Sequence, residues 1–413
     1  MNPARALIIV WLAVLFAGCV PVSSQQGRQP PGTGSVVDPL PVEVTSGDQE
    51  KTASMDAVFV HKGALFGIDL STSTVNELVP VDGSGQKTES AVFARDGKRL
   101  LLHRNWVGRD SWWTVKTDGS DLRQLPILGE KQTGPVTSLR DEEFVACFKG
   151  EDLVLFGLSG GEPVYQALES DAQCNQNGQL VASPDGGAFA FTSSDSVIIA
   201  RVQDNHIKLE HRVPGQKIFG WVSGMSLVTA DTSNLYLVNA SSGQVKRGEI
   251  HSIIPSAASL TGVAINPTGK SMYITATLKS GEGATQAVDP LTLIPLAAGA
   301  DRQPADAFGP TAFSPRGKFA VWVIPGTRGV PVAIARTDTG EAFLKTNETT
   351  VPVPYSFHPG DAAVLYSRPA ADAGEYELHL KDLSDKDRVL WRWKSTDGMD
   401  SVEWNPTLAG SGS

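Results

Sequence analysis

The sequence lacks most of the features that would assign it a chemistry. Its 413 residues include only three cysteines, and the seven histidines are scattered without metal-ligand spacing to a second ligand. It contains no Gly-x-Ser-x-Gly elbow, His-Glu-x-x-His motif, Walker loop or dinucleotide-binding glycine pattern. We therefore predict no catalytic residues, no metal and no cofactor, and we expect a protein that is not an enzyme.

Basic runs and long apolar runs are missing as well. The formal net charge is −10 and no cluster of Lys and Arg stands out, so a nucleic-acid partner is not expected. The unbroken apolar run at residues 6–16 is too short to span a bilayer. No amphipathic helical run interrupts the chain, whereas 41 glycines and 26 prolines suit a fold with many turns.

The first 53 residues are predicted to lie outside the folded body. A positive charge at Arg5 followed by the apolar run is typical of a signal peptide, which we place at residues 1–19. One interpretation is an ordinary cleaved signal peptide, in which the cysteine at its end has no special role. Residues 20–53 are rich in Gln, Pro, Gly and Ser and show no periodicity, which predicts a disordered tether.

The end of the apolar run carries a family resemblance. Leu15-Phe16-Ala17-Gly18-Cys19 resembles the lipobox of bacterial lipoproteins, in which the cysteine is acylated and becomes the mature N-terminus. The resemblance implies lipidation at Cys19, with palmitate among the acyl chains, and a lipid-anchored, periplasmic or surface-exposed location in the cell envelope. Val20 follows the cysteine, which favours the outer membrane if the source has two membranes.

One pattern recurs about eight times between residues 54 and 407. Its clearest copy, Thr311 to Gly340, predicts a strand, a Ser-Pro-Arg-Gly-Lys turn, a second strand, a Pro/Gly loop and an alternating strand that ends in a Thr-Asp-Thr-Gly turn. The turn position held by Pro315 recurs at intervals of 39 to 48 residues, which is typical of propeller blades. The equivalent positions are Arg95, Asp141, Pro184, Ser223, Pro267, Pro315, Pro359 and Pro406.

The two ends of the series predict how the fold closes. The first unit lacks an opening strand, whereas the last has only an opening strand, Ser401 to Trp404. We therefore predict an all-β fold, a β-propeller of eight four-stranded blades closed by a C-terminal strand that joins the first blade. Two units, at Asp141 and Ser223, match the repeat only weakly and are termed eroded units. The count would be seven blades if one of them is not a blade. Residues 408–413 are predicted to form a disordered tail.

The repeated turn carries a second resemblance. The segments Phe93 to Lys98, Ala182 to Gly187 and Ile265 to Lys270 resemble the Pro-Asp-Gly repeat of TolB-type, WD40-like β-propellers. The resemblance covers nearly all of residues 54–407. It implies the fold and a periplasmic setting, but not the role of TolB in its complex, because the domain that precedes the propeller in TolB has no counterpart here.

Candidate partner-binding residues lie in the more variable loops. In a propeller, the turns between second and third strands share one face with the connectors between blades, and binding usually resides in such variable loops. The segment Arg104 to Asp110 combines a tryptophan with two arginines, residue types enriched at binding hot spots. Alternatively, Trp106 folds over the blade edge and the charges are solvated. The candidates are Arg104, Trp106, Arg109, Asp110, Arg328 and Arg368.

These patterns predict a membrane-anchored propeller that binds another envelope protein or a glycan. We expect a monomeric propeller that acts as a binding or scaffold module within a complex. The alternative is a propeller enzyme of the lyase or glycosidase type with a site at the central tunnel. Cys147 and Cys174 are a possible disulfide pair, although Cys147 could equally be a free, buried cysteine in a strand.

Overall fold

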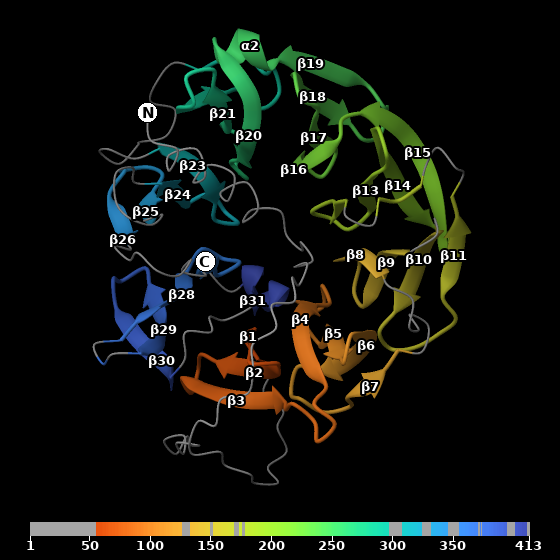
Figure 1. Ribbon diagram of the computed structural model, residues 1–413, viewed down its shortest axis with the longest axis vertical. Coiled ribbons are helices and arrows are strands. Elements are labelled where there is room, and N and C mark those ends of the chain that lie inside the picture. Colours follow the sequence, from red (N-terminus) through yellow and green to blue (C-terminus); the bar gives the residue numbers. More distant parts are fainter. Residues whose placement is uncertain are drawn as a thin grey trace, which may run out of the picture.

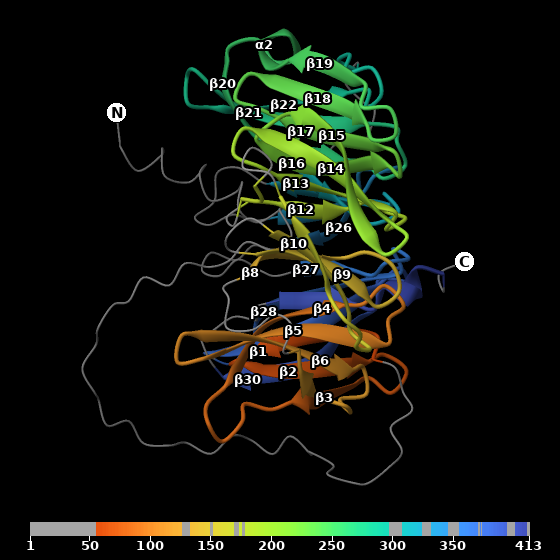
Figure 2. The ribbon, with the colours of Figure 1, turned by 90° about the vertical axis from the view of Figure 1, so that its right-hand side faces the viewer.

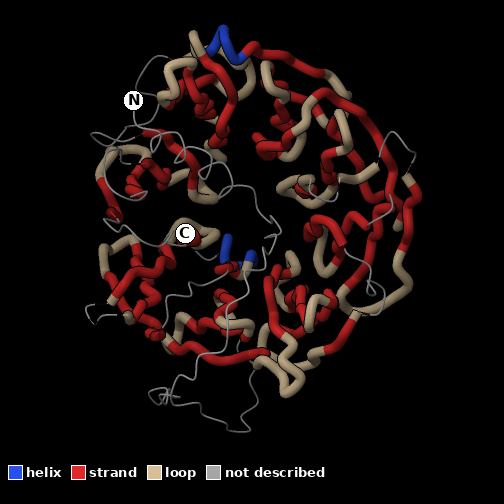
Figure 3. Tube along the Cα trace, viewed as in Figure 1, coloured by secondary structure: helices blue, strands red, loops and turns tan. Residues whose placement is uncertain are grey.

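A computed structural model shows a ring of eight antiparallel sheets around a central axis (Figure 1). Strands dominate the trace and helix is confined to short segments (Figure 3). The described residues are 55–125, 133–148, 152–168, 173–175, 178–296, 308–323, 332–345, 355–370, 372, 374–394 and 401–410. Within these ranges, none of the helices has the length and apolar character of a membrane span. The predicted signal peptide, Cys19 and the tether lie outside them.

Each sheet is one blade, and its strands follow one another along the chain. Blade 1 contains β31 (Ser401–Trp404), β1 (Ala57–His61), β2 (Ala64–Asp69) and β3 (Thr74–Val79), and blade 2 contains β4 (Lys87–Phe93), β5 (Arg99–Trp106), β6 (Arg109–Lys116) and β7 (Arg123–Gln124). Blade 3 contains β8 (Thr133–Ser138), β9 (Glu143–Phe148), β10 (Asp152–Gly157) and β11 (Val164–Ala167), and blade 4 contains β12 (Leu180–Ala182), β13 (Ala188–Thr192), β14 (Ser196–Gln203) and β15 (His206–Pro214). The innermost strand is the first in each group.

Blade 5 contains β16 (Lys217–Ser223), β17 (Ser226–Ala230), β18 (Asn234–Asn239) and β19 (Val245–Glu249), and blade 6 contains β20 (Ala257–Ile265), β21 (Met272–Leu278) and β22 (Gly283–Val288). Blade 7 contains β23 (Phe308–Phe313), β24 (Phe319–Val323), β25 (Val332–Arg336) and β26 (Ala342–Lys345), and blade 8 contains β27 (Tyr355–Phe357), β28 (Ala363–Pro369), β29 (Glu375–Asp382) and β30 (Asp387–Lys394). In blade 6, an isolated bridge between Val288 and Pro295 stands where a fourth strand would be. A single helical turn, α2 (Ile250–Ile253), connects blades 5 and 6.

The eight blades confirm the prediction of eight rather than seven. The two eroded repeat units form the β8–β9 hairpin of blade 3 and the β16–β17 hairpin of blade 5. Their turns have lost the Pro-x-Gly residues, but the flanking strands keep their apolar alternation and therefore still pair.

The predicted closure is also confirmed, because β31 pairs antiparallel with β1 from Ala57 opposite Trp404 to Val60 opposite Ser401. The next residue, Asn405, is buried, and its Nδ2 donates to the carbonyls of Met55 and Gly97, each at 3.1 Å. The seam is thus tied to the β4–β5 turn of the following blade.

The 3-10 helix η3 (Pro406–Gly410) follows this seam. Its first turn is held by Asn405 Oδ1, which accepts hydrogen bonds from the backbone N–H and the hydroxyl of Thr407 at 3.1 and 2.7 Å. The prediction of a disordered tail over residues 408–413 is therefore wrong for residues 408–410, which belong to this helix. Residues 411–413 lie outside the described part.

Apolar side chains are buried mainly between adjacent blades. Phe189 and Phe191 of blade 4, for example, pack against Val145 and Leu155 of blade 3. Each sheet has two faces, one covered by the preceding blade and the other by the following blade. A blade therefore cannot complete its core alone.

At the seam, this packing is strongly aromatic. Phe59 of β1 lies 5.1 Å from Trp391 of β30, and Trp391 stacks on Trp393 at the same centroid distance. Blade 1 is therefore held to blade 8 by aromatic rings as well as by strand pairing.

The tight turns between first and second strands hold successive blades together by hydrogen bonds. Asp361 of blade 8 is fully buried, and its carboxylate accepts hydrogen bonds from the Ser314 hydroxyl at 2.6 Å and from the backbone N–H of Arg316 and Lys318 at 3.1 and 2.9 Å. The turn that makes the repeat visible in the sequence is thus a structural joint.

A disulfide bond joins Cys147 of β9 to Cys174 in the connector to blade 4, with a Cα–Cα distance of 5.9 Å. Both cysteines are buried in the core shared by blades 3 and 4. The bond therefore reinforces a blade–blade interface.

A matched pair of glycine substitutions tests the importance of the seam. Gly97 and Gly85 both have positive φ, 68° and 84°, so alanine introduces similar backbone strain of about 1–2 kcal/mol at either site. A Cβ at Gly85 meets open space, whereas at Gly97 it would lie 2.8 Å from Asn405 Cγ and from Thr407 Cγ2. We expect Gly97→Ala to lower the free energy of unfolding by about 1–3 kcal/mol more than Gly85→Ala, measured by chemical denaturation of the full chain. Equal losses would show that the seam tolerates displacement of Asn405.

Candidate functional site

The predicted binding segment forms the tip of the β5–β6 hairpin in blade 2. The turn contains only Val107 and Gly108, and their φ values of 49° and 76° are those of a type I′ turn. Asn105 Nδ2 donates to Asp110 Oδ1 at 2.8 Å, and Asn105 Oδ1 accepts from the Gly108 N–H at 3.1 Å. The tip is therefore a tight, hydrogen-bonded structure and not the longer loop that the sequence predicts. Figure 2 shows the ring from the side, with blade 2 among the lower blades.

The outermost side chains of this tip are apolar and exposed. Trp106 is 41% exposed and Val107 is 86% exposed. The indole N–H of Trp106 donates to the carbonyl of Ser84 at 2.8 Å, and the Arg109 guanidinium lies 6.0 Å from the indole centroid. The indole ring of Trp106 is thus anchored at one edge by the β3–β4 connector, as expected if Trp106 folds over the blade edge, while much of its surface remains open to solvent.

Arg104 does not belong to this exposed surface, and its prediction as a partner contact is wrong. The residue is only 2% exposed, its guanidinium lies 5.2 Å from the Trp113 centroid, and it donates to the Gln86 carbonyl at 3.2 Å. Burial lowers the pKa of Arg104, and the negative charge of Asp82 partly offsets this effect. Strand β5 extends two residues beyond Arg104, so the arginine lies within the sheet and not in the loop.

The two remaining arginine candidates do not join the tip. Arg328 lies outside the described residues. Arg368 is exposed on β28 of blade 8, and blade 1 stands between it and blade 2 (Figure 1). Its Nε lies 3.7 Å from Glu377 Oε2, and Glu377 also pairs with Arg392 at 2.9 Å.

A buried polar network surrounds Glu377 in blade 8. His379 contacts Glu377 through Nε2 at 2.9 Å and Asp387 through Nδ1 at 3.0 Å, and the Tyr366 hydroxyl donates to Asp387 at 2.6 Å. Burial raises the pKa of Glu377, but the hydrogen bond from His379 and the nearby positive charges outweigh it, so the pKa lies below its ordinary value. Because its members bind one another, the network stabilises blade 8.

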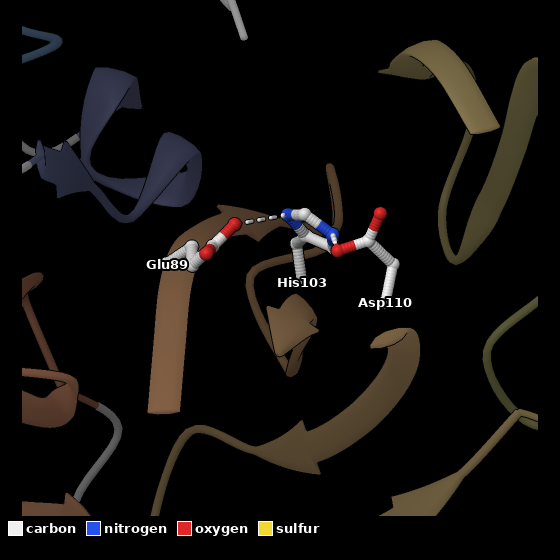
Figure 4. Close-up of side chains that lie close together, drawn as sticks. All are labelled: Glu89, His103 and Asp110. Carbon is white, nitrogen blue, oxygen red and sulfur yellow. Dashed lines mark ion pairs between the residues drawn. The ribbon is translucent and has the colours of Figure 1, made fainter. Parts of the chain in front are cut away.

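Blade 2 contains another cluster of polar side chains, which the sequence did not predict. His103 of β5 lies between two carboxylates, with Nδ1 3.3 Å from Glu89 Oε2 and Nε2 3.2 Å from Asp110 Oδ1 (Figure 4). One potential ligand atom from each residue lies within 4.8 Å of the other two. The residues come from β4, β5 and β6 and share no short motif, so only the strand register brings them together. His103 and Asp110 are diagonal neighbours in this register.

Glu403 occupies the innermost strand of blade 1 and is the described carboxyl with the most strongly raised pKa. Desolvation by the surrounding protein raises the pKa of Glu403 from 4.5 to about 7. The side chain is nevertheless accessible to solvent, and water screens part of this effect. No charge among the described residues contributes to the shift. Glu403 is thus an acid on the innermost strand whose raised pKa results from desolvation alone.

These features define the chain as an eight-bladed β-propeller protein. Its sequence matches no family profile and no curated protein. A solved structure that shares the fold is that of a eukaryotic initiation factor (11% identity, TM-score 0.53, covering 85% of this chain and 98% of that one). The chain also matches an oligogalacturonate lyase in complex with manganese (14%, 0.48, 80% and 98%). TolB from Acinetobacter baumannii is matched as well (14%, 0.37, 84% and 66%). At these identities the likeness concerns the fold alone, and the more specific resemblance to TolB-type lipoproteins stays a prediction.

The raised pKa of Glu403 predicts how stability depends on pH. Between about pH 4.5 and 7, the carboxyl keeps its proton in the folded state but loses it in the unfolded state, so raising the pH favours unfolding. Glu403→Gln removes this penalty. We expect the variant and the wild type to be equally sensitive to acid below pH 4.5, and the variant to become progressively more stable than the wild type up to about pH 7.

Thermal unfolding of the full chain at several pH values measures this difference. Glu249→Gln, at an exposed position, serves as a surface control. A difference between Glu403→Gln and wild type that does not grow with pH would contradict the expectation.

Proposed function

We propose that the chain is a lipid-anchored propeller of the bacterial cell envelope that binds another protein or a glycan through the tip of the β5–β6 hairpin. The observation that carries the proposal is the exposed Trp106–Val107 pair with Arg109 against the indole ring. Tryptophan and arginine contribute disproportionately to binding energy when a partner excludes water from them.

The rigidity of the hairpin tip supports a binding role. The turn is fixed by Asn105, and Trp106 is fixed by Ser84, so little conformational entropy remains to be lost when a partner binds. Arg109 and Asp110 place both signs of charge beside the apolar ring. This combination suits a partner with an apolar group and nearby polar groups, as a protein loop or the face of a sugar ring offers.

The proposed location depends on the N-terminal residues. The lipobox-like sequence ending at Cys19 supports acylation, and the tether at residues 20–53 would let the propeller stand away from the membrane. Stable anchoring requires more than one acyl chain or a second membrane signal. Several acyl chains on one lipoprotein cysteine would satisfy this requirement.

An enzyme acting at the central tunnel is the second candidate function. Glu403 favours it, because a carboxyl whose pKa is raised above its ordinary value on an inner strand can act as a general acid or base. Retaining and inverting glycosidases need two carboxyl groups at a set separation. We prefer the binding function, because it rests on several residues in contact, whereas the enzymatic function rests on Glu403 alone.

Removing two side chains of the hairpin tip should weaken partner capture. We expect the double variant Trp106→Ala, Arg109→Ala to lose at least about tenfold in affinity, since hot-spot truncations cost about 2 kcal/mol or more. The measurement is quantitative capture by the immobilised full chain, from detergent-solubilised envelope proteins and on purified insoluble peptidoglycan. Met225→Ala, at a 56% exposed residue in the β16–β17 turn, is the control. Equal capture by the double variant and the control would contradict the binding site.

Substitution of Cys19 tests the anchor independently of the partner. We expect Cys19→Ala to move the chain from the membrane fraction to the soluble fraction and to abolish incorporation of labelled palmitate. The physical reason is that the acyl chains supply the membrane affinity. Cys147→Ala is the matched control, because Cys147 is in the disulfide bond and should not affect acylation. A Cys19→Ala chain that stays in the membrane fraction would contradict lipid anchoring at this residue.

A further inference from the structure

We propose that Glu89, His103 and Asp110 form a binding site for a divalent transition-metal ion, with zinc as the best fit. The three residues contribute one imidazole nitrogen and two carboxylate oxygens, all within 4.8 Å of one another. Zinc accepts these ligand types at about 2 Å, and sites with three protein ligands leave a fourth position for water or a partner group. The site shares Asp110 with the hairpin tip, but binding of the ion does not depend on the identity of the partner.

Strand geometry makes the three side chains neighbours, with Glu89 beside Nδ1 and Asp110 beside Nε2 of the His103 imidazole. The register between β4 and β5 shifts between Thr88 and Ser90, so Glu89 is the extra residue of a β-bulge opposite His103. A bulge re-aims a side chain, and bulges are over-represented next to functional sites. Asp110 approaches from β6 on the other side of the imidazole (Figure 4).

Neighbouring side chains hold two of the proposed ligands in position. The imidazole of His103 stacks on the indole of Trp112, with a centroid distance of 4.9 Å and an interplanar angle of 28°. Asp110 accepts a hydrogen bond from Asn105 Nδ2 at 2.8 Å. Such outer partners fix the orientation of ligands in metal sites and are part of a site's affinity.

The third ligand can supply the remaining adjustment. Ligand atoms around a tetrahedral zinc ion are about 3.3 Å apart, so a group whose ligand atoms lie within 4.8 Å of one another must contract by up to about 1.5 Å to close on the ion. The side chain of Glu89 is 51% exposed, whereas those of His103 and Asp110 are 22% and 27% exposed. Glu89 is therefore free to move toward the two better-held residues, and the ion can enter from the solvent side.

The donor set also discriminates between metals. Magnesium and calcium prefer sites made of oxygen ligands, and magnesium usually retains several waters. An imidazole nitrogen with two carboxylates favours zinc and its first-row neighbours. A bound ion would cross-link β4, β5 and β6, and would therefore stiffen the hairpin that carries Trp106 and Arg109.

Zinc titration of the metal-free full chain in detergent, followed by calorimetry and thermal unfolding, tests the proposal. We expect one zinc ion to bind per chain and to raise the unfolding temperature. Glu89→Gln and Asp110→Asn should weaken binding by at least about tenfold, and His103→Ala should abolish it. His206→Ala, at an exposed histidine of blade 4, is the matched control and should bind like the wild type.

Two results would overturn the assignment. One is the absence of zinc binding to the wild type at zinc concentrations well above that of the chain. The other is equal binding by the wild type, Glu89→Gln and Asp110→Asn, which would place the ion elsewhere. Glu89→Gln keeps the test valid even if His103→Ala fails to fold, because Glu89 is half-exposed and its removal leaves the Trp112 stacking intact. Tighter binding of magnesium or calcium than of zinc would refute the choice of a transition metal.

Discussion

The pairing of β31 with β1 is the interaction on which the rest of the ring depends. It joins residues from the two ends of the propeller, and it places Asn405 where it can bind the backbone of blades 1 and 2. Each blade buries its faces only against its neighbours, so an open ring would leave a sheet edge and two apolar faces exposed to water. The cost of bringing distant chain segments together rises only slowly with loop length, whereas the buried area gained by closure includes the aromatic seam of Phe59, Trp391 and Trp404.

The closed ring explains why the architecture could be predicted so fully from the sequence. A turn that joins blades must satisfy backbone groups in a fixed geometry, and Ser314, Gly317 and Asp361 meet this requirement with residue types that stand out in a sequence. The strands are also visible in the sequence, because burial against neighbouring blades requires apolar side chains at many of their positions. Eight blades and the closing strand follow from these two signals. The short helix η3 was missed because its signal is a single side chain, Asn405, whose capping role depends on the folded seam.

The candidate site could be predicted only in part, since it depends on where strands end and how they are registered. Trp106 and Arg109 were recognised from their residue types. Arg104 was assigned to the same surface because the sequence does not reveal that β5 continues to Trp106. The group of Glu89, His103 and Asp110 was missed for a related reason: a bulge in β4 and a diagonal pairing between β5 and β6 are properties of the register. Neither property leaves a motif in the chain.

Blade 2 combines polar and aromatic features on both sides of one hairpin. On one side Arg104 and Trp113 anchor the sheet, and on the other His103 stacks on Trp112 between two carboxylates. Asn105 connects these features to the turn, since it binds both Asp110 and Gly108. Anything that fixes Asp110 therefore also fixes the turn that presents Trp106. A small local change at this hairpin can alter the binding surface. Asp110 orients the tip through its hydrogen bond with Asn105, and its side chain is also accessible to ions in solution.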